Sequence, residues 1–337
     1  MARHIARWDL DKTYLRTEFD TFRDLVRTAL ERPDEKRTNP GAATLLREMV
    51  RAGISVHILS GSPEQMRRRL EDKLRLDGIK WDSFTLKPNL TNLLRFRFRA
   101  MRDQLGYKLP ALLDARARAT PPAPDDPDIR HETLFGDDAE ADAFVYSLYG
   151  DVLAGRVDDE TLLAICARGN MYEDVIEAVT QSLQRMPRED AVERVLIHLE
   201  RQTPPDDFDP YGKRAVPFYN YFQAALVVHE AGRIPAEAVL RVAVELVVQH
   251  RFDGDALGRS YLDLARRGHL KGTSAEGITE ALEDWSHHDA VPGLPELRRM
   301  SEVLPEHAKL AREKYGDGKS TTPDYMALVE KHNPRKK

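Results

Sequence analysis

Short apolar runs alternate with longer amphipathic stretches through the first half of the chain. The runs at residues 4–8, 54–60, 81–86 and 131–138 have the length and composition of buried strands. Apolar residues recur at helical spacing between these runs. Helices are predicted at residues 17–32, 42–53, 63–78, from about 89 to 106, and at 109–119, the last one opened by Lys108. Strand and helix alternating at this spacing predict an α/β fold with a doubly wound parallel sheet.

From residue 158 the pattern becomes helical in piece after piece, and proline or glycine marks nearly every junction. Helical segments are predicted at residues 161–169, 171–186, 189–202, 217–232, 235–250 and 255–268. No residue pattern recurs at a fixed period, so a helical-repeat architecture is not indicated. We therefore expect two domains, an α/β domain over residues 1–157 and an all-helical second domain of unknown role over residues 158–337.

Composition narrows the class of protein. The 337 residues carry a net charge of −5, which argues against a generally basic nucleic-acid binder. The most apolar segment, residues 239–250, is interrupted by Arg241 and Glu245, so no transmembrane segment is expected. No apolar targeting segment precedes the first acidic residues, which predicts a cytoplasmic protein. The single cysteine, Cys166, has no partner for a disulfide or a cysteine metal site.

Two carboxylates, Asp9 and Asp11, follow the first predicted strand in the sequence WDLDKT. In open parallel sheets, ligands bind beyond the carboxyl ends of the strands. Acidic turns also occur as surface loops and helix caps, so this pair is only moderately specific by itself.

Three further signals follow in order along the chain. Ser60 and Ser62 end the second strand in the sequence SGS, Lys108 follows the third strand, and the acidic turn GDDAEAD at residues 136–142 ends the last predicted strand. This order of aspartate pair, hydroxyl, lysine and acidic turn resembles the haloacid dehalogenase superfamily over residues 1 to about 155.

The resemblance implies a phosphatase that uses Mg²⁺. Asp9 would attack phosphorus and bind the metal, and Asp11 would act as proton shuttle while its backbone carbonyl also binds the metal. Asp137 would supply a second carboxylate ligand, in keeping with the oxygen ligands that Mg²⁺ prefers.

The remaining site residues are expected to bind the phosphoryl group or to orient its neighbours. Ser60 and the positions of Thr13, Gly61 and Ser62 would hold phosphoryl oxygens. Lys108 would neutralise the transferring group. Lys87, directly after the third strand, is the rival for this role. Asp142 is expected to orient Lys108 or a metal-bound water, and Asp138 to lie in the outer shell of the metal.

Within the superfamily, the chain looks most similar to the phosphatidate phosphatase catalytic domain of the yeast actin-patch type, a relative of the lipins. The similarity rests on residues 39–46, 58–63, 107–108 and 135–146. Three positions depart from that pattern, Lys12, Gly61 and Asp138, and they leave the lipid substrate in doubt.

The substrate class therefore stays open between a lipid headgroup, a small soluble phosphate and a phosphorylated macromolecule. No nucleic acid is expected as a partner, and peripheral contact with a membrane is compatible with the sequence. Little sequence separates the motifs, which leaves no room for a large cap, so the helical domain could supply a lid. The alternative to catalysis is a partner-binding or regulatory protein that retains the phosphatase fold as a scaffold.

Overall fold

The computed structural model describes residues 4–16, 36–87, 101–119, 130–288, 290–316 and 322–332. The helix predicted at residues 17–32 and most of the one predicted at 89–106 lie outside these ranges. The strands are β1 Ile5–Trp8, β2 Ser55–Pro63, β3 Ser83–Lys87, β4 Glu132–Asp137, β5 Val192–His198 and β6 Ala215–Phe218. The helices are α2 Ala42–Arg51, η1 Glu64–Met66, α3 Arg67–Leu76, α4 Met101–Arg118, α5 Asp142–Leu153, α6 Asp159–Arg168, α7 Glu173–Leu183, η3 Pro205–Tyr211, α8 Tyr221–Glu230, α9 Ala236–His250, α10 Gly254–Arg266, α11 Ser274–His288, α12 Leu294–Lys314 and α13 Tyr325–His332.

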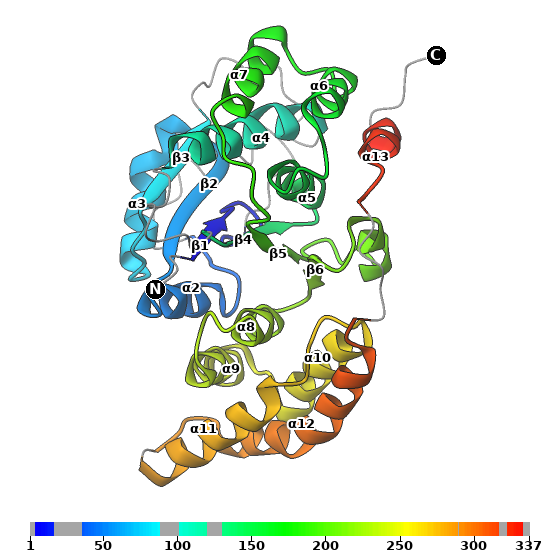
Figure 1. The fold of residues 1–337 in the computed structure, drawn as a ribbon. Coiled ribbons are helices and arrows are strands. Elements are labelled where there is room, and N and C mark those ends of the chain that lie inside the picture. The colour runs from blue at the N-terminus through cyan, green and yellow to red at the C-terminus, as the bar shows by residue number, and fades with distance from the viewer. Residues whose placement is uncertain are drawn as a thin grey trace, which may run out of the picture.

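Six parallel strands form one sheet in the order β3-β2-β1-β4-β5-β6 (Figure 1). The strand β1 lies between β2 and β4, with Ile5 opposite Ser55 on one side and Glu132 on the other. All four residues of β1 are buried, as expected of a strand covered on both faces. The order of the strands reverses at β1, and ligands bind in such sheets at the carboxyl ends beside this switch point. The predicted parallel α/β class is confirmed.

The sheet is wider than the sequence pattern predicts. Residues 189–202, predicted as a helix, contain β5, which pairs with β4 so that Leu196 lies opposite Phe135. The helix prediction is wrong because a short apolar run fits a buried strand and a buried helix equally well, and pairing with a neighbouring strand decides between them. The segment predicted as a helix from residue 217 also begins in the sheet, with β6. The helix α8 starts only at Tyr221, after the cap Asn220.

Two hydrophobic clusters cover the two faces of the sheet. Alternate residues of one strand enter different clusters, since Phe135 packs with α2, α8 and α9, whereas Leu134 packs with α4 and α5. The first cluster continues without a break from the sheet into α10, α11 and α12. The helix α13 returns to contact α5 and α6 (Figure 1).

The chain after β6 is all-helical, as the sequence predicts. The strands β5 and β6 lie after the expected domain boundary at residue 157, and the helices α8 and α9 contact α2 directly. The division into two domains remains a prediction. Among the described residues, every helix is too short or too polar to cross a lipid bilayer.

Candidate active site

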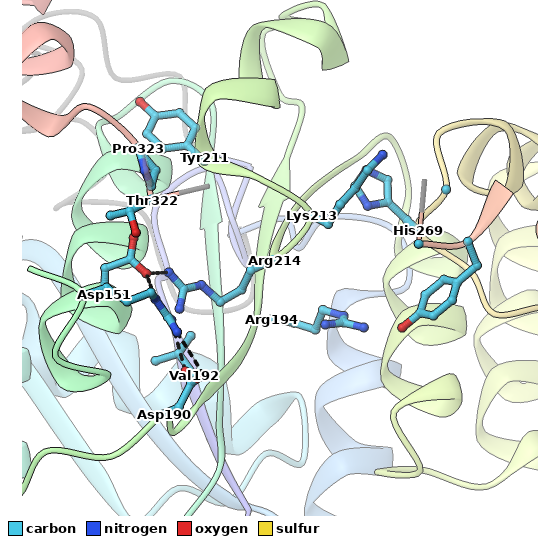
Figure 2. A pocket seen from close by; sticks show the side chains of 14 residues that line it. Asp151, Asp190, Val192, Arg194, Tyr211, Lys213, Arg214, His269, Thr322 and Pro323 are labelled. Atoms are coloured by element: carbon cyan, nitrogen blue, oxygen red, sulfur yellow. Dashed lines mark hydrogen bonds and ion pairs between the residues drawn. The ribbon is translucent and has the colours of Figure 1, made fainter. Parts of the chain in front are cut away.

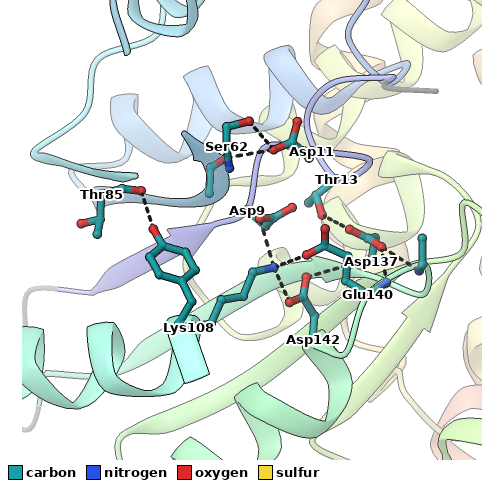
Figure 3. Close-up of polar contacts among 12 residues, drawn as sticks. Asp9, Asp11, Thr13, Ser62, Thr85, Lys108, Asp137, Glu140 and Asp142 are labelled. Carbon is teal, nitrogen blue, oxygen red and sulfur yellow. Dashed lines mark hydrogen bonds and ion pairs between the residues drawn. The ribbon is translucent and has the colours of Figure 1, made fainter. Parts of the chain in front are cut away.

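Three buried aspartates meet at the carboxyl edge of the sheet (Figure 3). Asp9 directly follows β1, and its amide extends the ladder by donating to the Phe135 carbonyl at 3.0 Å. Asp137 is the last residue of β4, and Asp142 is the first residue of α5. One carboxylate oxygen from each of the three aspartates lies within 4.8 Å of the others, so this cluster could hold a metal ion.

The turn between β4 and α5 places its acids through backbone hydrogen bonds. Asp137 Oδ1 accepts from the amides of Ala139 at 2.7 Å and Glu140 at 3.0 Å, and Asp142 Oδ2 accepts from the Asp137 amide at 3.2 Å. Gly136 makes this close approach feasible, because a Cβ atom at that position would lie 2.4 Å from Asp142 Oδ2. The sequence GDDAEAD thus folds back so that its first and last acids reach the same point.

Lys108 is buried in the middle of these acids. The prediction that Lys108 opens a helix is wrong, because this residue lies inside the continuous helix α4. The contact of α4 with the sheet directs the side chain inward. The Nζ atom lies 3.1 Å from Asp9 Oδ1, 2.5 Å from Asp142 Oδ1 and 2.9 Å from Glu140 Oε2. The rival, Lys87, is the last residue of β3. Sequence reasoning missed Glu140, although the acid-rich turn that it belongs to was the signal.

Asp11 is turned towards the end of β2 rather than towards Lys108 (Figure 3). Its Oδ2 atom accepts hydrogen bonds from Ser60 Oγ at 2.9 Å and from Ser62 Oγ at 2.7 Å. The two serines reach the same carboxylate because residues two apart on a strand share a face. The Ser62 amide also donates to Ser60 Oγ at 3.0 Å, while Gly61 between them is partly exposed.

The turn after Asp11 is strained and held from several sides. Lys12 has a φ of 61°, a left-handed conformation that costs about 1–3 kcal/mol for a residue other than glycine. Asn39 Nδ2 donates to the Lys12 carbonyl at 2.9 Å, and His198 Nδ1 lies 3.1 Å from the same oxygen. Asn39 Nδ2 at 2.7 Å and the Tyr221 hydroxyl at 2.6 Å donate to the Thr13 carbonyl. His198 and Tyr221 were not anticipated because their segments were assigned to a helical domain of unknown role, with no residue of it placed in the site.

Thr13 and Asp138 belong to the same edge of the sheet but face different neighbours. The Thr13 hydroxyl donates to Asp137 Oδ2 at 3.4 Å. Asp138 instead accepts from the amides of Arg201 at 2.8 Å and Thr203 at 3.0 Å. Asp138 therefore anchors the loop after β5, and its carboxylate does not join the cluster.

The cluster has an excess of negative charge. Within the described residues, the Lys108 ammonium pairs with the carboxylates of Asp9, Glu140 and Asp142, and Asp137 adds a fourth carboxylate beside Asp9 and Asp142. Burial raises the pKa of the Asp9 and Asp137 carboxyls well above their usual range, and the neighbouring acids raise it further. Burial also raises the pKa of Asp142, to about 6. Burial lowers the pKa of Lys108, but Asp142, Asp9 and Glu140 outweigh it and hold that pKa well above its usual range.

Asp9 has the fewest partners of these acids. Neither of its buried oxygens makes a hydrogen bond within the described residues, and its one ion-pair partner there is the Lys108 ammonium. A buried carboxylate is costly unless a cation or hydrogen-bond donors compensate it. The donor set and its charge therefore fit a divalent cation bound through oxygen.

Known proteins do not identify the chain: no family model, no curated protein and no solved structure matches it. The geometry alone establishes a buried acidic cluster, able to hold a metal, at the carboxyl edge of a parallel α/β sheet.

Proposed function

We propose that the protein is a Mg²⁺-dependent phosphatase of the haloacid dehalogenase type, which hydrolyses a phosphomonoester through an aspartyl-phosphate at Asp9. One observation carries this proposal. Asp9 directly follows the inner strand β1, and among the described residues neither of its carboxylate oxygens has a hydrogen-bond partner. It lies 3.1 Å from a buried lysine and is grouped with Asp137 and Asp142. A nucleophile, a metal site and a cation for the phosphoryl oxygens thus lie at one point of the sheet.

The metal would be held by the carboxylates of Asp9 and Asp137 and by the backbone carbonyl of Asp11. Two unit charges 4 Å apart repel by about 4 kcal/mol near a protein surface, so an anionic nucleophile and a phosphate ester need compensation. When bound, Mg²⁺ would supply it by neutralising charge on the substrate phosphate. The Lys108 ammonium would contribute from the protein side.

Each residue then has a defined part in the reaction. An oxygen of Asp9 attacks phosphorus, and the bond between phosphorus and the leaving oxygen breaks as Asp11 gives that oxygen a proton. In the second step Asp11 takes a proton from water, the water oxygen attacks phosphorus, and the bond to Asp9 breaks to release phosphate. Burial raises the pKa of Asp11, which suits a group that must donate a proton near neutral pH.

Asp142 and Glu140 would act through Lys108. Their oxygens lie 2.5 and 2.9 Å from its Nζ atom and fix the ammonium beside Asp9. The Ser60 and Ser62 hydroxyls hold Asp11 in place. The Ser62 amide already donates to Ser60 Oγ, so the Gly61 amide is the candidate for binding a phosphoryl oxygen.

The proposed substrate class includes a phosphatidate-type lipid beside small soluble phosphomonoesters. A cavity of about 330 Å³ borders the acidic turn, lined by Glu140 and by the apolar side chains of Phe144, Phe208 and Leu328. Arg201 and Lys331 also line it. Because the acids Asp138 and Asp207 line it as well, the cavity would suit the apolar part of a leaving group.

Phosphate release tests the proposal. The substrate panel is phosphatidate in mixed vesicles, glycerol phosphate, p-nitrophenyl phosphate and a phosphopeptide, each with Mg²⁺ or chelator. We expect Mg²⁺-dependent release that falls by about 10³-fold or more in Asp9→Asn. The matched control is Asp206→Asn, an exposed aspartate on η3, which should retain activity. No metal-dependent release from any substrate would refute the enzyme and favour a binding scaffold. Release unchanged in Asp9→Asn would refute the nucleophile.

A further inference from the structure

A second polar cavity lies at the opposite edge of the sheet from Asp9, beside the amino ends of β5 and β6 (Figure 2). It has a volume of about 330 Å³, large enough for a small organic ligand. Arg194 comes from β5, and Lys213 and Arg214 directly precede β6. His269 follows α10 and Tyr315 follows α12, so both the sheet and the helical region contribute to this cavity.

The acids in the wall of this cavity are already neutralised. Arg156 binds Asp190 through two hydrogen bonds of 3.0 and 3.1 Å. Asp151 accepts from Arg156 Nε at 2.7 Å, from Arg214 Nη2 at 2.5 Å and from the Tyr325 hydroxyl at 2.5 Å. The charges of the Asp151 and Asp190 carboxylates are therefore balanced by the guanidinium groups of Arg156 and Arg214. Neither acid is left to balance the charge of Arg194 or Lys213.

Arg194 and Lys213 retain uncompensated charge. Within the part of the chain that the structure describes, neither has a carboxylate at ion-pair distance. Arg194 Nη1 donates to the Glu193 carbonyl at 2.9 Å, and Lys213 Nζ donates to the Arg267 carbonyl at 2.8 Å. These carbonyls carry no formal charge, so the described residues that line the cavity carry an excess of positive charge.

Several donors in this wall are also unsatisfied. Within the described residues, His269 Nδ1 and the Nε and Nη1 atoms of Arg214 are buried without a hydrogen-bond partner. Burial, together with the charges of Arg267, Lys213 and Arg194, lowers the pKa of His269 to about 3. Arg267 is itself paired with Asp263, whereas neither Arg194 nor Lys213 has a carboxylate partner within the described residues.

We propose that this cavity binds the oxyanion group of a small molecule, a phosphate or a carboxylate, between Arg194, Lys213 and His269. An anion there would pair with both uncompensated cations and accept hydrogen bonds from donors that now lack partners. The ligand would also connect β5 and β6 with the segments after α10 and α12. Binding would therefore stabilise the contact between the sheet and the helical region. This site is independent of the proposed chemistry at Asp9.

The imidazole of His269 provides a readout that the Asp9 site does not share. In the full chain with chelator present, the carbon and proton resonances of His269 are followed by NMR during titration with inorganic phosphate and, separately, with citrate. We expect a saturable shift with at least one of the two probes, and the tighter probe identifies phosphate or carboxylate as the preferred group. No saturable shift of His269 with either probe would overturn the proposal.

Charge variants assign the binding to this cavity. The double variant Arg194→Gln, Lys213→Gln should raise the dissociation constant of the better probe by at least about tenfold. Lys309→Gln, the same change on the exposed face of α12, should leave it unchanged. Should the double variant fold poorly, Lys213→Gln alone changes an exposed residue and should still weaken binding severalfold. An unchanged dissociation constant in these variants would contradict the proposal.

Discussion

Single side chains at the carboxyl edge of the sheet give two neighbouring aspartates, Asp9 and Asp11, different surroundings. Among the residues that the structure describes, Asp9 lies beside acids and one lysine and accepts no hydrogen bond, whereas Asp11, two residues later, is held by two serine hydroxyls. A carboxylate whose oxygens are not occupied by hydrogen bonds is available as a nucleophile or metal ligand. A hydrogen-bonded environment suits a group that must keep one orientation while it transfers a proton.

Ser62 should position Asp11. In Ser62→Ala the carboxylate loses a 2.7 Å hydrogen bond that stabilises its charged form, so the pKa of Asp11 should rise. We expect kcat to fall by about tenfold, and the limb of the pH–rate profile that depends on ionised Asp11 to move to higher pH. Ser62→Thr keeps the hydroxyl and should restore the wild-type profile. A lower rate without any change in the pH profile would contradict this role.

His4 should make the free energy of unfolding depend on pH. Burial lowers its pKa in the folded protein from 6.5 to about 4, with Arg233 and His131 lowering it and Glu193 and Glu132 opposing them. The unfolded chain therefore binds more protons between these two values, and stability falls as the pH drops from about 6.5 to 4. For one histidine this loss is on the order of 2 kcal/mol.

Urea denaturation at pH 7, 5.5 and 4.5 in the presence of chelator measures this effect. Other groups also titrate in this range, including the acids at the sheet edge whose pKa is raised. The pH dependence of the unfolding free energy is therefore compared between variants and wild type. The unfolding free energy of His4→Gln should fall less with pH than that of the wild type. His287→Gln, an exposed histidine on α11, should behave like the wild type. Equal slopes in His4→Gln and wild type would refute the assignment.

At the scale of elements, the β4–α5 turn depends on a glycine. A methyl group at Gly136 would lie 2.4 Å from Asp142 Oδ2 and 2.5 Å from Asp142 Cβ. The variant Gly136→Ala must therefore displace Asp142 from Lys108. We expect a loss of about 2–3 kcal/mol of stability and most of the activity. In contrast, Gly106→Ala inside α4 would place its methyl group 3.9 Å from Met171 and should be neutral or stabilising. Thermal unfolding and Mg²⁺-dependent phosphate release measure both variants, and wild-type values in Gly136→Ala would contradict the account.

Elements also show how far the sequence could predict this structure. The strands β1, β2, β3 and β4 were predicted because each short apolar run is bounded by polar residues, and their order placed Asp9, Ser60 and Asp137 at the edge where the structure has them. The strand β5 was missed because its apolar centre, residues 195–197, has no local feature that separates strand from helix. Only pairing with β4, sixty residues earlier in the chain, determines it.

The same limit explains the missed site residues. Glu140 reaches Lys108 because the turn folds back on itself, a geometry that spacing alone does not give. His198 and Tyr221 come to the Asp11–Thr13 turn from distant segments, through the sheet and through α8. Residues of one motif are recognisable along the sequence, whereas the residues that support the motif are brought there by tertiary packing.

At the scale of the whole molecule, the helical region is part of the support of the site. Tyr221, the first residue of α8, donates to the Thr13 carbonyl at 2.6 Å, and its ring stacks on Trp8 with a centroid distance of 5.9 Å. Glu245 of α9 accepts from the Gly41 amide at 3.0 Å, at the start of α2. The helices α8 and α9, which follow the sheet in the sequence, thus stabilise the turn at Thr13 and the turn at Gly41.

Removal of one hydrogen bond tests this support. Tyr221→Phe keeps the ring but leaves the buried Thr13 carbonyl with one donor fewer, which should cost about 1–2 kcal/mol of stability. We also expect kcat to fall severalfold, because the strained Lys12 turn sets the position of Asp11. Tyr219→Phe, an exposed tyrosine beside it, should change neither quantity. Urea denaturation and phosphate release check both, and wild-type behaviour of Tyr221→Phe would show that α8 does not support the site.

Trapping of the phosphorylated enzyme tests the central claim most directly. The protein is mixed with p-nitrophenyl phosphate and Mg²⁺, quenched in acid within the first turnover, reduced with borohydride and mapped by peptide mass spectrometry. The account predicts an acyl phosphate on Asp9 alone, seen as homoserine at that position after reduction and absent in Asp9→Asn. Turnover of the ester without modification of Asp9, or with the phosphate on another residue, would contradict it.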